Sequence, residues 1–170
     1  MKKGFSAKKD GFDCKIWHDK CDNKGKTLVI IKTKDNFIFG GFTEVGFTTD
    51  QSKWSTKWRD PDRGMITDPN SFIFSLRNDK NDRKPEKFTI RKGEQSNAIF
   101  YYYSSYGPSF GFIDSPGDFR LYNDLQLGYS NFGRSYNLPN GIKQRTNEAK
   151  SYLAGSYKSS KVDEVETYFL

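Results

Sequence analysis

The last third of the chain contains the run Gly107-Pro108-Ser109-Phe110-Gly111, which says more about the fold than any other segment. Glycine next to aromatic residues is typical of tight turns and of strands that approach one another closely. Similar segments recur along the chain: Phe39-Gly40-Gly41-Phe42-Thr43, Asn131-Phe132-Gly133-Arg134, Tyr152-Leu153-Ala154-Gly155-Ser156, and the closing run Val165-Glu166-Thr167-Tyr168. Together they indicate a strand-rich domain.

Apolar spacing predicts many short strands and few helices. The first two strands are Leu28-Val29-Ile30-Ile31 and Phe37-Ile38-Phe39, which are separated by a turn at Asp35-Asn36. Further strands are predicted over residues 71–76, 87–90, 98–103, 110–113 and 162–170. A helix is predicted over about residues 5–22, because Phe12, Ile16 and Trp17 recur at helical spacing, and a shorter one over residues 146–153.

These elements predict an α+β fold that is mostly β. We expect a two-sheet antiparallel β-sandwich over about residues 27–170, flanked by short helices, in one domain that spans residues 1–170. The segment 50–69 is expected to be a loop or a short irregular helix, because it contains Trp54, Trp58, Pro61, Gly64 and Pro69. The charged segment 77–87, with Pro85 inside it, is expected to be an exposed hairpin-like connection.

The composition describes a water-soluble domain with an aromatic core. Only 34% of the 170 residues are hydrophobic, but 16% are aromatic and 29% are charged. No apolar run approaches the ~20 residues of a membrane span, and the N-terminus lacks the apolar region of a secretory signal. Cys14 and Cys21 are the two cysteines of the chain, so a cytoplasmic location is expected.

The net charge of +7 is concentrated near the N-terminus. Residues 1–26 hold eight lysines and four aspartates, which leaves +4 there. A solvated lysine-rich surface explains this, and the alternative is a patch for an acidic protein, anionic lipid or nucleic acid.

Nucleotide and nucleic-acid binding have little support. The chain has no Gly-x-x-x-x-Gly-Lys, and Gly128 and Gly133 do not form a dinucleotide fingerprint. Tyr101-Tyr102-Tyr103 resembles a base-stacking platform, but alternation along a strand would place two rings in the core and one at its rim. No nucleic-acid partner is therefore expected.

Cys14, His18 and Cys21 share one helical face and raise the question of a metal. Two turns of helix would separate the thiols by ~10 Å, too far for both to bind one zinc ion. No metal or cofactor is therefore expected, and a redox-active thiol remains an alternative. A Ser-His-Asp site would have to use His18, the only histidine, and no Gly-x-Ser-x-Gly elbow is present.

Glu164 and Glu166 alternate along the last predicted strand, ~7 Å apart by strand rise. Val162, Tyr168 and Leu170 are expected on the same face, so Glu166 is the first candidate for a partly buried carboxylate. Acid–base catalysis by this pair is one alternative, and pairing with a nearby lysine or arginine is the simpler explanation.

Several ordered segments resemble the TLDc domain, a family that includes the oxidation-resistance proteins. The run from Cys21 to Leu28 is similar to the opening CDxKGPTL-type segment, with Lys26 in the usual proline position. The other similar segments are FGGYTS-type (39–43), AFLFSL-type (71–76), GPxFG (107–111), YLAGS (152–156) and IEVF-type (165–166). The motif positions carried over are Gly40, Gly41, Gly107, Pro108, Gly111, Gly133, Gly155, Ser156 and Glu166. Ser115-Pro116-Gly117 departs from the usual GxDL segment, with Asp118 or Asp124 as the counterpart of its aspartate.

The resemblance implies a β-sandwich with short helices and a protein-interaction module rather than an enzyme. Members of the family protect cells against oxidative stress, and several bind the vacuolar proton-pumping ATPase. By resemblance this chain would bind that pump at the periphery of vacuolar or lysosomal membranes, through the exposed loops, without a cofactor. An antioxidant or hydrolytic enzyme that uses a cysteine or Glu166 is one alternative, and a basic surface for anionic lipid is another. TLDc domains often end longer chains, which leaves open that this one is a piece of a larger protein.

Overall fold

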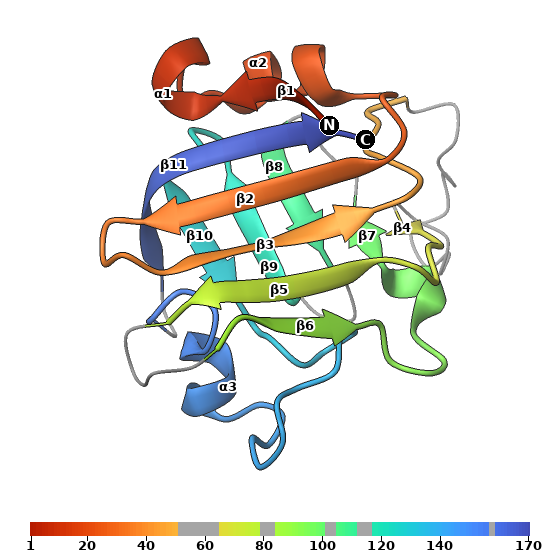
Figure 1. Ribbon diagram of the computed structural model, residues 1–170, viewed down its shortest axis with the longest axis vertical. Helices are drawn as coiled ribbons and strands as arrows, with labels where there is room; N and C mark the ends of the chain where they lie inside the picture. Colours follow the sequence, from red (N-terminus) through yellow and green to blue (C-terminus); the bar gives the residue numbers. More distant parts are fainter. Residues whose placement is uncertain (51–64, 79–83, 101–104, 112–116, 157–158) are drawn as a thin grey trace.

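The computed structural model describes residues 1–50, 65–78, 84–100, 105–111, 117–156 and 159–170 (Figure 1). Eleven strands and a few short helices make up these residues. The strands are β1 (Lys2–Ser6), β2 (Thr27–Thr33), β3 (Ile38–Thr43), β4 (Met65–Ile66), β5 (Phe72–Arg77), β6 (Glu86–Thr89), β7 (Ile99–Phe100), β8 (Tyr106–Phe110), β9 (Phe119–Tyr122), β10 (Leu127–Ser130) and β11 (Ser160–Phe169). The helices are α1 (Ala7–Asp10), α2 (Cys14–Cys21), α3 (Asn147–Ser151) and the 3-10 turn η2 (Gln95–Asn97).

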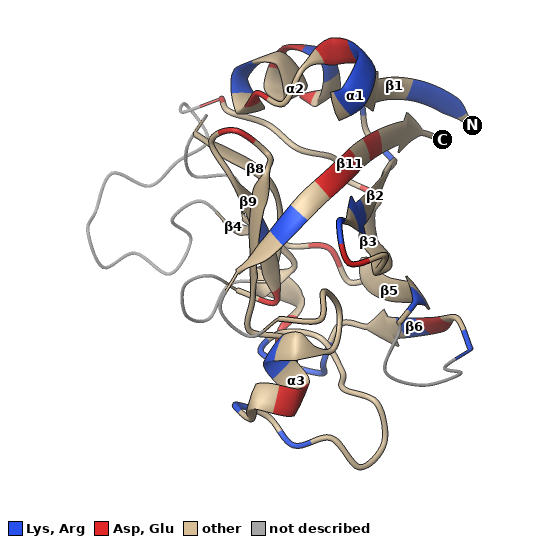
Figure 2. Cartoon of the chain, turned by 90° about the vertical axis from the view of Figure 1, so that its left-hand side faces the viewer, with Lys and Arg blue, Asp and Glu red and all other residues tan. Residues whose placement is uncertain are grey.

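All strand pairs are antiparallel and belong to one hydrogen-bonded sheet, in the order β4-β7-β8-β9-β10-β11-β2-β3-β5-β6, with β1 beside β11. The strand β11 joins the two halves of this sheet. Its first residues pair with β10, where Leu127 lies opposite Lys161, and its remainder pairs with β2, where Ile31 lies opposite Val165. In Figure 1, β2, β3, β5 and β6 form the front half, and β8, β9 and β10 lie behind it; Figure 2 shows β8 and β9 on the opposite side of the core from β3 and β5.

The core lies between the two halves. The strand β2 alternates buried and half-buried residues along its whole length, with Val29 and Ile31 fully buried. Across the core, the ring of Phe39 on β3 meets the ring of Phe119 on β9 edge-on, with 5.4 Å between centroids. Burying one such large side chain contributes ~1.5–3 kcal/mol, so a few aromatic residues can hold the halves together.

The prediction of a mostly-β fold with a few short helices is confirmed. The sequence pattern did not reveal that the strands form one continuous sheet joined through β11, and the two-sheet sandwich stays a prediction.

The single helix predicted over residues 5–22 is wrong. Residues 2–6 form strand β1, and the helical part is divided between α1 and α2. Gly11 has φ of 107°, which ends α1. Asp13 then caps α2 by accepting hydrogen bonds from the backbone nitrogens of Lys15 and Ile16 at 2.6 and 3.1 Å. The cap residue restarts the helix, which the apolar periodicity could not show.

The second predicted helix is present as α3. Thr146 caps it, accepting a hydrogen bond from the backbone nitrogen of Ala149 at 3.2 Å. Tyr101-Tyr102-Tyr103, residues 51–64 of the first predicted loop and residues 79–83 of the second lie outside the described residues. The described remainder is not all loop, because residues 65–66 form β4, Arg77 ends β5, and Glu86 and Lys87 begin β6.

Among the described residues, none of the helices is both long and apolar enough to cross a membrane.

Candidate functional site

The most unusual polar group of the domain is Asp118, a fully buried aspartate that immediately precedes β9. Four consecutive backbone nitrogens donate hydrogen bonds to its carboxylate. Those of Gly133, Arg134 and Tyr136 lie 2.8, 3.0 and 3.3 Å from Oδ1, and that of Ser135 lies 2.7 Å from Oδ2. The carboxylate therefore holds the segment 133–136 against the start of β9, and we call this arrangement the aspartate clamp.

Gly111 shapes the other side of the clamp. It has φ of +73°, and a Cβ atom there would lie 2.0 Å from Asp118 Oδ2. Any side chain would thus displace the carboxylate from the amides. The backbone nitrogen of Asp118 donates to the carbonyl of Phe110 at 3.0 Å, which ties the GPxFG motif to the same point. The final glycine of this motif, Gly111, is explained by the close approach of its backbone to Asp118.

Two opposing effects act on the acidity of Asp118. Burial raises the pKa of its carboxyl to about 7, and the four amide hydrogen bonds work in the opposite direction without cancelling the rise. A carboxyl that is ordinarily ionised well below neutral pH is thus poised to change its charge near neutral pH.

The segment 133–136 continues into a second buried anchor. The hydroxyl of Tyr136 donates to the carbonyl of Ala98 at 2.8 Å and lies 2.9 Å from Ser71 Oγ. Tyr136 is fully buried and its ring lies 6.4 Å from that of Phe110. The clamp and this tyrosine together join three motif-bearing segments, 71–76, 107–111 and 130–136.

The glycines of the FGG motif allow close packing within the sheet. A Cβ atom on Gly41 would lie 2.6 Å from the ring of Phe110, and one on Gly40 would lie 2.7 Å from the ring of Phe74. Gly41 therefore admits Phe110 into the core, whereas a Cβ atom on Gly40 would first meet the carbonyl oxygen of Val29 at 1.9 Å and then the ring of Phe74.

The remaining motif residues also serve packing. Gly107 and Pro108 lie buried in β8, where a Cβ atom on Gly107 would lie 2.3 Å from Leu125. Gly155, with φ of +78°, packs against the ring of Phe37, and Ser156 is half-buried next to it. In the same YLAGS motif, the hydroxyl of Tyr152 donates to Glu86 Oε2 at 2.5 Å.

Glu166 lies on β11, half-buried and away from the clamp. It forms an ion pair with Lys3 on β1, and the hydroxyl of Tyr168 donates to its Oε2 at 2.8 Å. Partial burial raises the pKa of Glu166, but the hydrogen bonds from Lys3 and Tyr168 outweigh it and hold the pKa below its usual value. Of the two interpretations of Glu166, catalysis or pairing with a basic residue, the structure shows the pairing, with Lys3.

Glu164 shares this face of the strand, but the prediction that Val162 lies on it too is wrong. A bulge between Val162 and Glu164 shifts the register with β2, and Val162 is buried in the core. Such a bulge turns the strand by one residue, which an alternating pattern cannot reveal.

Both cysteines are buried on α2. Burial raises the pKa of Cys14 and of Cys21 to about 12 in each case, so both thiols stay protonated at neutral pH. His18 lies between them in the sequence, but its ring nitrogens face Asp22 Oδ1 and the carbonyl of Tyr106, each at 2.8 Å. In the described part of the chain, no group of three or more His, Cys, Asp or Glu side chains is placed to hold a metal ion.

The lysines near the N-terminus are largely matched by carboxylates, as the mixed colours of α1 and α2 in Figure 2 show. Five of the eight in residues 1–26 form ion pairs: Lys3 with Glu166, Lys8 with Asp163, Lys15 with Asp19, Lys20 with Asp10 and Lys26 with Glu44. The excess charge of this region is therefore interleaved with acidic groups.

Sequence reasoning did not single out the clamp as a site. It left Asp118 and Asp124 as equal counterparts of one motif aspartate, whereas the structure buries Asp118 and exposes Asp124 in a turn. The available signal was the pair Gly117-Asp118, with a second glycine at Gly111. Glycine around an aspartate indicates a tight backbone approach but not the identity of the donors.

These features define a β-rich domain in which the glycine motifs and a buried aspartate organise the core. The sequence profile of the TLDc domain matches residues 1–170, and the chain therefore belongs to the TLDc domain family, which is linked to oxidative-stress resistance. A comparison with individual curated proteins gives no match.

Proposed function

We propose that this TLDc domain is a non-enzymatic protein-interaction module that contributes to oxidative-stress resistance by binding and regulating the vacuolar proton-pumping ATPase. Membership of the family suggests the partner, and it also suggests a cytoplasmic location at the periphery of vacuolar or lysosomal membranes. The observation that carries the proposal is the aspartate clamp. The carboxylate of Asp118, which lies among the family motifs, is buried and bound by four backbone amides. It therefore stabilises the fold, and recognition of a partner would use the surface of the domain.

The state of the thiols supports a non-enzymatic role. A cysteine that consumes peroxide reacts as the thiolate and needs access to solvent. Cys14 and Cys21 have neither property, because both are buried and their pKa values are raised to about 12. Protection against oxidants would then come from a bound partner and not from these thiols.

The environment of Glu166 points the same way. Its carboxylate is already bound by Lys3 and Tyr168, and its lowered pKa keeps it ionised at neutral pH. A general acid needs a raised pKa, so Glu166 is better suited to fastening β1 to β11.

The test is co-elution of the recombinant 170-residue chain with purified vacuolar ATPase, together with measurement of ATP hydrolysis. Binding with changed hydrolysis or with release of subunits is the expected result. Failure to associate at micromolar protein with a pump from the matched species would contradict the proposal. Peroxide consumption by the isolated chain, lost in Cys14→Ser/Cys21→Ser, would instead establish an antioxidant enzyme.

A further inference from the structure

The front half of the sheet consists of β2, β3, β5 and β6, and its outer surface is apolar. The solvated face of a sheet is ordinarily polar. An antiparallel sheet with one face in water usually alternates apolar residues toward the core with polar residues outward. Here the outward positions of β2, β3 and β5 carry large apolar side chains instead. We call them the outer apolar face: the half-buried Leu28, Ile30, Ile38, Phe42 and Phe72, together with Phe74, which is only 7% exposed.

These side chains form one continuous patch because the strand register places them side by side. Leu28 lies opposite Phe42, and Phe42 lies opposite Phe72 on the next strand. The rings of Phe42 and Phe72 stack with 5.1 Å between centroids, and the ring of Phe74 lies 6.4 Å from that of Phe72. Ile30 extends the patch from β2, opposite Gly40, over which the ring of Phe74 lies.

No described helix or strand covers this face. In Figure 1 it is turned toward the viewer, with α1 and α2 above it and α3 below; in Figure 2, β2, β3, β5 and β6 form one outer layer of the described chain. Contiguous apolar surface rimmed by polar residues marks a site of interaction.

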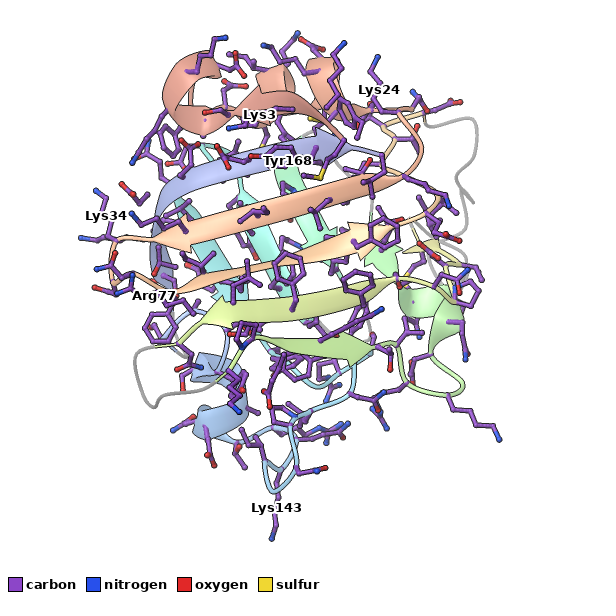
Figure 3. All side chains as sticks on the ribbon, viewed as in Figure 1. Lys3, Lys24, Lys34, Arg77, Lys143 and Tyr168 are labelled. Carbon is purple, nitrogen blue, oxygen red and sulfur yellow. The ribbon has the colours of Figure 1, made fainter. Side chains whose placement is uncertain are left out.

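The charges around the face favour an acidic occupant. The ammonium of Lys87 lies 4.0 Å from the centroid of the Phe72 ring, and no carboxylate of the described residues forms an ion pair with it. Figure 3 shows Lys34 and Arg77 at one edge of the face. Two carboxylates that border it form ion pairs, Glu166 with Lys3 and Glu44 with Lys26. With a net charge of +7, the domain presents apolar rings next to the cation of Lys87.

A helix suits this face better than an extended strand. A segment lying flat on a sheet contacts side chains, so a strand placed there would leave its own backbone groups without partners, whereas a helix satisfies them internally. From these observations we infer that the outer apolar face binds an acidic amphipathic helix of a partner protein, with apolar residues over Phe42 and Phe72 and carboxylates toward Lys87. This inference rests on the proposed role as an interaction module and specifies the surface and the chemistry of its partner.

Binding is measured by fluorescence anisotropy of a labelled helical peptide of leucine, alanine and glutamate, about 18 residues and ~27 Å long. A second peptide carries lysine in place of every glutamate. The 170-residue chain is expected to bind the acidic peptide at least about tenfold more tightly than the basic one. Equal binding of both peptides, or binding of neither, overturns the inference.

Two variants locate the contact. Phe42→Thr/Phe72→Thr removes the stacked rings while keeping residues that favour strands, and Lys87→Glu reverses the charge beside the Phe72 ring while keeping both rings. Each is expected to weaken acidic-peptide binding about tenfold or more. Lys143→Glu makes the same charge change in a loop at the far end of the domain (Figure 3) and is expected to leave binding unchanged. If Lys87→Glu and Lys143→Glu weaken binding of the acidic peptide equally, the net charge of the domain explains the binding, and the assigned face is contradicted.

The same variants separate this inference from the proposed function. If the wild-type chain and both face variants bind the vacuolar ATPase equally, the inference fails and the proposed function stands. If the pump does not bind but the acidic peptide binds through this face, the proposed function fails and the inference stands. A dimer in sedimentation experiments that Phe42→Thr/Phe72→Thr dissolves would assign the face to a second copy and overturn the acidic-helix inference.

Discussion

The backbone nitrogen of Ser135 donates a hydrogen bond of 2.7 Å to Oδ2 of Asp118, although 17 positions separate the two residues in the chain. The other oxygen of the carboxylate accepts from the backbone nitrogens of Gly133, Arg134 and Tyr136. Oδ1 therefore accepts three hydrogen bonds and Oδ2 accepts one. A substitution that keeps an oxygen in the Oδ1 position should destabilise the domain less than one that removes both oxygens.

Asp118→Ala should destabilise the domain severely. It would leave four buried amides without an acceptor, and one unsatisfied buried group costs ~1–3 kcal/mol. Asp118→Asn should cost less, because an amide oxygen in the Oδ1 position still accepts three of the four hydrogen bonds. Urea unfolding of the three proteins measures the difference. Equal stability of Asp118→Ala and the wild type would show that the clamp contributes nothing.

The clamp should also give stability a particular pH dependence. Burial raises the pKa of Asp118 from 3.8 to about 7 in the folded state. Between these values the folded state holds a proton that the unfolded state releases, so the stabilisation is greatest below pH 3.8 and is lost as the pH rises through 7. Relative to Asp118→Asn, the wild-type free energy of unfolding should fall between pH 4.5 and 7 by up to ~1.4 kcal/mol per pH unit. Above this range the difference should level off, and a difference that is constant with pH would contradict the raised pKa.

Gly41→Ala should destabilise the domain through Phe110. The added Cβ atom would lie 2.6 Å from the Phe110 ring, so the ring or the strand must move. Overpacking of this kind costs ~1–3 kcal/mol. Phe110→Leu in the same chain should recover part of the loss, and a double-mutant cycle of unfolding free energies measures the coupling. If the two unfolding free-energy changes are strictly additive, the contact with the Phe110 ring is not the reason that residue 41 must be glycine.

Cys14 and Cys21 should be inert in the folded protein. Burial raises both pKa values to about 12, so hardly any thiolate is present at pH 8. A coloured thiol reagent should react with two thiols in denaturant and with almost none under native conditions. Fast native labelling at the rate of a small free thiol would revive the antioxidant alternative.

Glu166→Gln should have only a small effect on stability. Its partner Lys3 is 47% exposed, and exposed ion pairs contribute ~0–1 kcal/mol. Thermal unfolding in low and high salt measures the contribution, and Lys15→Gln, which breaks the pair with Asp19, is a matched control. A loss of several kcal/mol specific to Glu166 would mean that the residue does more than hold β1 to β11.

Local patterns in the sequence predicted the strand content well and the long-range geometry poorly. The continuous apolar run of residues 28–31, predicted as a strand, lies in β2, where burial alternates from one residue to the next. The bulge before Glu164 and the break at Gly11 depend on single backbone conformations, which periodicity averages away. The motif glycines were recognised as points of close approach, but the group that Gly111 approaches became visible only when the fold brought Asp118 next to it.

The position of β11 has a consequence for biosynthesis. This strand pairs with β1, β2 and β10, and in the order of the described strands it connects the two halves of the sheet. During translation, β11 leaves the ribosome after β1, β2 and β10, with which it pairs. Until then, β2 lacks its β11 neighbour and the two halves of the sheet are not joined. Because β11 is synthesised last of these strands, we expect the domain to acquire its cooperative stability only after β11 has paired.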